Sequence, residues 1–460
     1  MVKIQFVAVA AAVLFLAMPV TAQSAAQNAG TDDKGIATND SRTVLTVEDA
    51  VQYALKNSTT LKTAAIDLEI KKRADSTSWN TLLPSAQVTG TASRANEVTG
   101  AIIPGYPAPE TQESDHWRLV GGLSFSWNFN VAMLQSMKAT HSSYDAGLIT
   151  YEQSLRQMER DVRKMFYSLL LMQESLKMQQ TSLQNAQSRA NQAATSYSNG
   201  RVPELQLLQA RVALENQRPS VLKLEQQVDQ NLATFAFLLG MPYGSKITLE
   251  GEIAPDYLEL NANALIDRYI GAKLDLQLLN KNIEVMNYNL KASQLSTFTP
   301  SLSLSWGLQP AAGLTAPKDD GIDAFTEHGS LSITLAWNLT PLLPWSTQRQ
   351  QAKDLEQTIA QTKLSLPIAT DQAKTEVTKL VDSLALSRSQ MGALEANVNM
   401  AQRAYTMTVQ GYQSGGRELL DVRDAEASLT QAQLGLLNEK LNYLSNLLDL
   451  EYALNTKLGK

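Results

Sequence analysis

The sequence contains no cysteine and only three histidines among its 460 residues. The missing cysteines exclude disulfide bonds, thiolate metal sites and a lipid anchor on cysteine. The histidines, His116, His141 and His328, have no carboxylate cluster near them at ligand spacing, so no metal site is expected. The sequence also lacks a nucleophile–base arrangement and a phosphate-binding loop. We therefore expect neither an enzyme nor a cofactor.

Positive charge and long hydrophobic runs are scarce as well. The net charge of −6 argues against nucleic acid as a partner. One long apolar run follows Lys3 and ends at a small-residue site, so residues 1–22 are predicted to be a signal peptide, cleaved after Ala22 or, alternatively, at Ala25-Ala26. This run is shorter than the ~20 residues of a spanning helix, and no other stretch is as apolar. A membrane span in the exported chain would have to consist of β-strands.

The rest of the chain is predicted to be a flexible leader followed by two related halves. Residues 23–43 are small and polar, which is typical of a leader. Residues 44–240 and 260–460 both contain a helix, a Pro-Ser pair, strands, a long helix and a glycine turn in the same order, and residues 241–259 link them. At a shift of about 215 residues the halves match at several positions: Leu45 with Leu260, Leu61 with Leu276, Tyr197 with Tyr412 and Gly200 with Gly415.

Four segments alternate apolar and polar residues, which predicts strands with one apolar face: about 85–94, 117–129, 301–308 and 331–339. Their lengths are close to the ~9–11 residues of a tilted membrane strand. A soluble sandwich with one wet face is the alternative. Four strands cannot close a barrel, because open edges in lipid would leave backbone groups unpaired. The chain is thus expected to oligomerise, and the pattern does not decide between two, three and four copies.

Tryptophan favours a membrane location for these strands. All six tryptophans lie within or just beside the four segments, and the predicted long helices contain none. Because tryptophan prefers the membrane–water interface, four of them are predicted to contact the lipid interface: Trp117, Trp127, Trp306 and Trp337.

Each half also contains a predicted long helical hairpin. Between Leu148 and Tyr197 apolar residues recur in steps of four and three, a coiled-coil pattern, and a helix over 131–198 would be about 100 Å long. The second half repeats the pattern in its long helix, and its return helix continues it through Val422, Ala425, Leu429, Ala432 and Leu436. The glycine turns predict hairpin tips near Gly200 and Gly415. Pro219 and Pro367 are expected to interrupt and kink helices.

These features resemble a known family. Leu45–Ala50, the Leu83-Pro84-Ser85 motif and the two Tyr-x-x-Gly turns are similar in order and spacing to the TolC-like outer-membrane efflux proteins, over nearly the whole mature chain. The resemblance implies a mainly α fold with membrane β: coiled-coil hairpins and four transmembrane strands per chain. It further implies a homotrimer that completes a shared twelve-stranded β-barrel and a periplasmic α-barrel.

The resemblance also implies a function and partners. The chain would be the outer-membrane channel subunit of a tripartite efflux or type I secretion system, with its helices in the periplasm. It would contact outer-membrane lipid, a periplasmic adaptor (membrane fusion) protein and an inner-membrane pump, and would conduct substrates passively. The alternative is a soluble periplasmic coiled-coil adaptor or scaffold, which predicts neither lipid-facing strands nor clustered tryptophans.

A gate is the most specific feature that the resemblance implies. In the family, two aspartates after the second turn ring the periplasmic constriction, and Asp421 and Asp424 match them here. They are three residues apart on one helix face, so three copies would form two acidic rings that favour cations. A solvated helix face is the alternative. Tyr412 and Arg417 match residues that latch the closed tip. Gln206 replaces their aspartate partner, which leaves a neutral hydrogen bond as the alternative to a charged latch.

Overall fold

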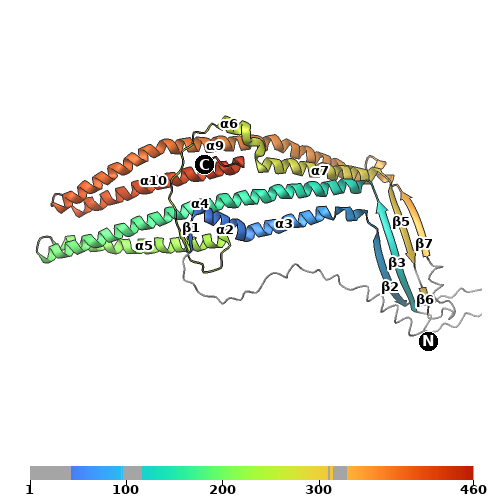
Figure 1. Cartoon of the computed structure of the whole chain (residues 1–460), viewed down its shortest axis with the longest axis horizontal. Coiled ribbons are helices and arrows are strands. Elements are labelled where there is room, and N and C mark those ends of the chain that lie inside the picture. Colours follow the sequence, from blue (N-terminus) through green and yellow to red (C-terminus); the bar gives the residue numbers. More distant parts are fainter. Residues whose placement is uncertain (1–42, 95, 97–116, 309–310, 314–328, 459–460) are drawn as a thin grey trace, which may run out of the picture. The chain divides into compact units, whose positions relative to one another are not determined.

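The computed structural model describes residues 43–94, 96, 117–308, 311–313 and 329–458 (Figure 1). The predicted signal peptide, His116 and His328 lie outside these residues. The helices are α2 (Val47–Asn57), α3 (Thr59–Ser76), α4 (Ala132–Ser198), α5 (Glu204–Leu239), α6 (Ala262–Tyr269), α7 (Leu274–Phe298), α9 (Thr347–Gln413) and α10 (Leu419–Leu454). The strands are β1 (Thr43–Leu45), β2 (Ser85–Arg94), β3 (Trp117–Phe129), β4 (Ile247–Leu249), β5 (Ser301–Leu308), β6 (Ala311–Gly313) and β7 (Gly329–Ala336).

The main sheet has the order β2-β3-β5-β7, and its paired strands are antiparallel. The pairing aligns side chains of one kind in rows across the sheet. One row contains Ala86, Phe125, Trp306 and Leu331, and the Phe125 and Trp306 rings lie 5.5 Å apart. A neighbouring row on the opposite face contains Ser85, Ser126, Ser305 and Ser332. The sheet therefore has the apolar and the polar face that the alternation predicts.

The ends of the strands differ from the prediction in two places. β7 ends at Ala336, so Trp337 and Leu339 follow the strand instead of belonging to it. The Asn338 side chain accepts a hydrogen bond from the backbone of Thr340, at 3.1 Å, and such a local bond turns the chain out of the ladder. The short strand β6 was not predicted, and it continues along β3 in the register of β5.

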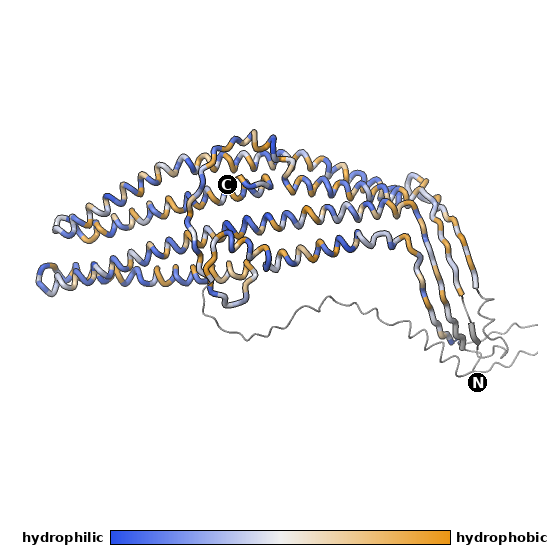
Figure 2. The backbone as a smooth tube through the Cα atoms, in the orientation of Figure 1, coloured by the Kyte–Doolittle hydropathy of each residue, from blue (hydrophilic) through white to orange (hydrophobic). Residues whose placement is uncertain are grey.

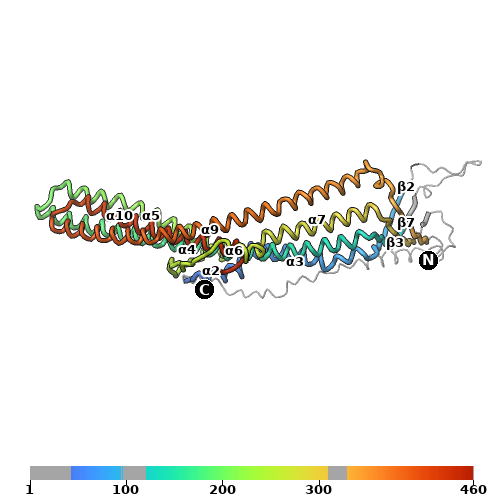
Figure 3. Tube along the Cα trace, turned by 90° about the horizontal axis from the view of Figure 1, so that it is seen from above, coloured from blue at the N-terminus to red at the C-terminus, as the bar shows by residue number. Residues whose placement is uncertain are grey.

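The helices form two long hairpins, α4–α5 and α9–α10 (Figures 1 and 3). α4 and α9 have 67 residues each, or about 100 Å at ~1.5 Å per residue. Neither proline ends its helix: Pro219 lies inside α5 and Pro367 inside α9. The kinks expected at the two prolines stay predictions. Both prolines are exposed, so water can hydrate the carbonyl groups that lose a helical donor.

Two hydrophobic cores lie mainly in one half each, and the first also contains Leu444 of α10. In the first, Val162 and Phe166 of α4 pack with Phe235 of α5 and Ala50 of α2. In the second, α9 and α10 bury a cluster that includes Val377, Tyr443 and Leu450. Thr46 and Asp49 form the capping box of α2. Hydrophilic and hydrophobic residues alternate along every long helix (Figure 2), which is the pattern of a helix with one buried stripe and one polar face. Within the described residues, no helix is long and apolar enough to cross a membrane.

Gly240 allows a test of this packing. It ends α5 at φ +80°, and a Cβ atom there would lie 2.5 Å from the carbonyl oxygen of Asn57. Gly200 has a similar φ of +66° but nothing within 4 Å. We expect Gly200→Ala to lower the free energy of unfolding by about 1–2 kcal/mol through backbone strain alone. Gly240→Ala should cost about 1–3 kcal/mol more, because the α2–α3 junction must move.

Chemical denaturation of the purified protein in detergent measures both variants. Equal losses for Gly200→Ala and Gly240→Ala would contradict the close approach of α5 to Asn57.

Candidate functional site

The same backbone motif closes both hairpin tips, which lie at the same end of the hairpins (Figures 1 and 3). Gly200 and Gly415 have φ values of +66° and +81°, in the left-handed region. The backbone N–H of Gly200 donates to Tyr197 at 2.9 Å, and that of Arg201 donates to Ser196 at 2.8 Å. Gly415 and the residue after it make the same two bonds, at 3.0 and 2.9 Å. Both turns are therefore Schellman motifs, in which glycine adopts the left-handed position at the least cost.

The two aspartates singled out in the sequence lie at the start of α10. Asp421 accepts a hydrogen bond from the backbone of Glu418 at 3.2 Å, and its Oδ2 is 3.9 Å from a guanidinium nitrogen of Arg417. The Asp424 side chain is 66% exposed, and its Oδ1 lies 3.7 Å from the Nε atom of Arg423. Both carboxylates thus stay in contact with water on one side of α10.

The three residues matched to a latch form no hydrogen bond with one another within the described chain. Arg417 folds back on its own turn, and a Cβ atom at Gly411 would lie 2.8 Å from its Cγ atom. The part of the chain that the structure describes contains no hydrogen bond from the Tyr412 hydroxyl or the Gln206 side chain.

A different polar cluster joins the two hairpins above the tips. The Glu426 carboxylate of α10 accepts hydrogen bonds from Arg189 at 2.6 Å and from Asn185 at 2.9 Å, both on α4. Tyr405 of α9 lies beside this pair. Burial, followed by the negative charge of Glu426, raises the pKa of Tyr405 above its ordinary value, although Arg189 opposes this.

The sequence pattern placed Ala425 in the packed seam and missed Glu426. In the structure Glu426 is buried and Ala425 is only half-buried. Glu426 lies four residues after Val422 and three before Leu429, so all three share one helix face. A charged residue on an otherwise apolar face was the signal that could have identified it.

The tryptophans lie at the sheet, as the sequence indicates. Trp306 and Trp337 are 37% and 55% exposed. Trp127 donates its indole N–H to the carbonyl of Leu82, at 2.7 Å, which ties the end of β3 to the turn before β2. Trp117 begins β3 and pairs with Arg94. The exposed rings of Trp306 and Trp337 can therefore contact the solvent or lipid around the sheet.

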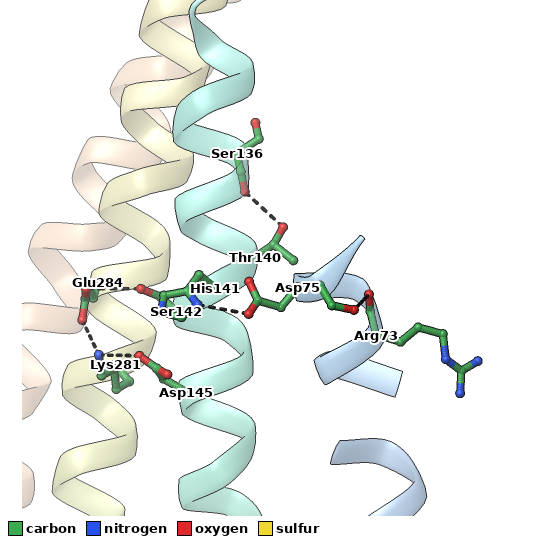
Figure 4. A network of polar contacts seen from close by, with 10 residues as sticks. Arg73, Asp75, Ser136, Thr140, His141, Ser142, Asp145, Lys281 and Glu284 are labelled. Carbon is green, nitrogen blue, oxygen red and sulfur yellow. Dashed lines mark hydrogen bonds and ion pairs between the residues drawn. The ribbon is translucent and has the colours of Figure 1, made fainter. Parts of the chain in front are cut away.

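A second polar network links α3, α4 and α7 (Figure 4). His141 Nδ1 lies 3.1 Å from Asp75 Oδ2, and Lys281 Nζ lies 3.1 Å from Asp145 and 3.0 Å from Glu284. Among the described residues no group of three or more histidine, cysteine or carboxylate side chains could hold a metal ion. The network therefore ties three helices together through alternating charges.

Solved structures of several outer-membrane channels share this fold. The CmeC outer membrane channel of Campylobacter jejuni has a TM-score of 0.73 at 18% identity, covering 89% of this chain and 85% of that one. The open state of the Neisseria gonorrhoeae MtrE outer membrane channel has a TM-score of 0.69 at 17% identity, covering 90% and 89%. For the outer membrane protein VceC of Vibrio cholerae the TM-score is 0.68 at 17% identity, covering 90% and 97%. The paired hairpins and the sheet thus form a TolC-like fold.

The family follows from the sequence itself. The model of the outer membrane efflux protein family matches residues 50–241 and again residues 265–456. Two successive matches confirm the internal repeat, and together they span most of the chain. The chain therefore belongs to the outer membrane efflux protein family. No sequence among the curated proteins matches it.

His141 provides a pH test of the α3–α4 contact. Its hydrogen bond to Asp75, together with the charges of Asp75 and Asp145, raises its pKa above the ordinary value. The ion pair therefore stabilises the fold fully below the unfolded-state pKa of about 6.5, and this contribution is lost as the pH rises through the higher folded-state value. We expect Asp75→Asn to lower the pKa of His141.

Titration of the imidazole resonance, in a chain with His116→Gln and His328→Gln, measures this pKa. An unchanged value in Asp75→Asn would contradict the contact, and Asp67→Asn on the same helix is the control.

Proposed function

We propose that the chain is the outer-membrane channel subunit of a tripartite efflux or type I secretion system. Three copies would build a duct that crosses the outer membrane through its strands and the periplasm through its helices. The single observation that carries the proposal is the sheet with the order β2-β3-β5-β7, which has one apolar face and two outer edges without a partner strand in the described residues.

The sheet needs neighbours for two reasons. The outer edges of β2 and β7 present backbone groups, and in lipid each unpaired group costs several kcal/mol. The side chains of both strands are exposed, with Val88 at 61% and Ile333 at 70%, so no described residue covers them. Pairing β7 of one copy with β2 of the next would satisfy both edges and close a ring.

The helices support the same assembly. One flank of α5 carries an unpartnered apolar stripe in heptad spacing, formed by Leu205, Leu208, Val212 and Leu222, which are 48–65% exposed. Other exposed positions of α5, outside this stripe, are polar and include Lys223 and Gln227. α9 exposes a second apolar stripe through Leu386, Met400 and Met407, at multiples of seven residues and 59–71% exposure. Two different stripes on one chain suit a head-to-tail interface, which generates a ring.

The number of copies and the partners come from the family resemblance. A homotrimer with twelve strands would form the barrel, and the exposed tryptophans would lie at the lipid interface. A periplasmic adaptor protein and an inner-membrane pump would dock at the tips and deliver the substrate. The duct itself would do no chemistry. The soluble adaptor alternative fits less well, because a soluble protein rarely exposes an apolar sheet face to water.

The tip carries the gate in this proposal. Asp421 and Asp424 are exposed on one side of α10, close to the turn. Three copies would place two rings of three carboxylates around the axis, and such rings favour cations and can bind a multivalent cation. Tyr412, Arg417 and Gln206 would contact neighbouring copies at the same level.

The selectivity of the pore tests the two rings. We expect the double substitution Asp421→Asn and Asp424→Asn to abolish cation preference, because it removes both rings of charge and keeps their shape. The reversal potential in planar bilayers under a salt gradient measures this. Asp371→Asn, an exposed acid on α9 with a 75% exposed side chain, is the matched control and should keep the preference. Unchanged selectivity in the double variant would remove the aspartates from the pore.

The apolar stripe of α5 tests the assembly. We expect Leu208→Glu to weaken the trimer, because each interface loses about 1.5–3 kcal/mol of leucine burial and gains a buried charge. Gln227→Glu introduces the same residue at an exposed polar position of α5 outside the stripe, and should leave the trimer intact. Light scattering of the detergent-purified protein measures the mass. Trimers of equal stability for both variants would place the interface elsewhere.

A further inference from the structure

Glu426 and Arg189 form an ion pair that is almost removed from water. Their closest atoms lie 2.6 Å apart, and their side chains are 8% and 14% exposed. Asn185 donates to the second carboxylate oxygen of Glu426, so both oxygens have a partner. The charged pairs of the tip itself are different, because the Arg417 and Asp421 side chains are 64% and 44% exposed. One ion pair near the tips is therefore dry while the others are wet.

This dry pair lies between the two halves of the chain. Arg189 belongs to the first hairpin and Glu426 to the second, 237 residues further on. On the same face of α10, Val422 and Leu429 are 2% and 8% exposed, and Leu419 packs against the alanine-rich core of the first hairpin. The first turns of α10 are thus held against the first hairpin on one side.

The other side of these turns carries the acidic residues. Asp424 is exposed and the Asp421 side chain is 44% exposed, whereas Val422 and Glu426 are buried. Because these turns form one rigid helix, α10 cannot move away from α4 without shifting both aspartates. The contact of Glu426 with α4 and the position of the proposed gate are mechanically linked.

We propose that the Arg189–Glu426 pair, held by Asn185, is the latch that keeps the second hairpin against the first and so keeps the tip closed. The proposal rests on the channel function proposed above. The latch lies within one copy, and it is charged, although Gln206 stands where the family has an aspartate. Separation of the hairpins hydrates both charges, so the closed tip has a dry pair and the open tip a wet one.

The physics of buried ion pairs gives the latch a distinctive signature. Removing one partner leaves the other charge buried and unpaired, which strongly destabilises the closed form. Replacing both partners by apolar side chains of similar volume removes that penalty and restores or strengthens the contact. A pair that merely filled space would not show this reversal.

The absence of cysteine allows a direct test. Val422→Cys introduces the only thiol of the chain, on the buried face next to Glu426. In this background we expect Arg189→Met to raise the rate of maleimide labelling about tenfold or more, because the closed form loses its counter-ion. Arg189→Met with Glu426→Leu should return the rate to that of the parent. Arg218→Met, which removes the exposed Arg218–Glu215 pair of the first hairpin, is the control.

The same variants are recorded in planar bilayers, where Arg189→Met should increase the conductance and the double variant should restore it. Equal labelling of Arg189→Met and Arg218→Met would overturn the latch, as would a double variant that labels as fast as Arg189→Met. If Arg189→Met fails to fold, Glu426→Gln is the second variant, because it weakens the same ion pair. It should raise the rate of labelling severalfold. An unchanged rate would overturn the proposal. Labelling as predicted without current from any variant would refute the channel and retain the latch.

Discussion

The backbone groups at the outer edges of β2 and β7 impose the constraint on which the rest of the structure depends. A sheet with one apolar face needs an apolar surrounding, and in such a surrounding an unpaired N–H or carbonyl group is costly. Neither requirement is met within the described residues of one chain. In the proposed assembly, further copies would pair the edges and lipid would surround the apolar face, and the apolar stripes on α5 and α9 lie on surfaces that the same assembly would cover.

The charged residues of α10 also differ in their exposure to water from one side of the helix to the other. One side of its first turns is dry and carries Glu426, whose charge is balanced by Arg189 on the neighbouring hairpin. The other side is wet and carries Asp421 and Asp424. A single helix thus combines a structural contact with exposed carboxylates, and a small movement of the helix affects both. The neutral residue Gln206 at the other tip fits a closed state that is held from within each chain.

Much of this fold follows from local sequence patterns. Alternation at period two predicted the strands, heptads predicted the long helices, and glycine turns such as that at Gly415 predicted the hairpin tips. The errors arose where a nonlocal or side-chain effect outweighed the pattern. Asn338 turned the chain at the end of β7, and hydration of exposed carbonyls allowed Pro219 to stay within a helix.

The inter-hairpin ion pair could not be predicted in the same way. Periodicity assigns residues to a face, but it does not say which distant helix lies opposite that face. Glu426 and Arg189 come together only when the two halves of the chain fold against each other. The residues matched by family resemblance, such as Tyr412, were predicted from motifs. The structure of a single chain does not test their proposed contacts with neighbouring copies.

The central claim is that edge strands of separate copies join and that the ring closes at three. The cysteine-free chain permits Val88→Cys on β2 and Ile333→Cys on β7, both at exposed positions of the apolar face. Cross-linking of this variant in outer membranes with a short bifunctional maleimide, followed by denaturing electrophoresis, measures the joined species. The account predicts covalent dimers and trimers and nothing larger. Monomers alone, or a ladder that continues beyond three copies, would contradict it.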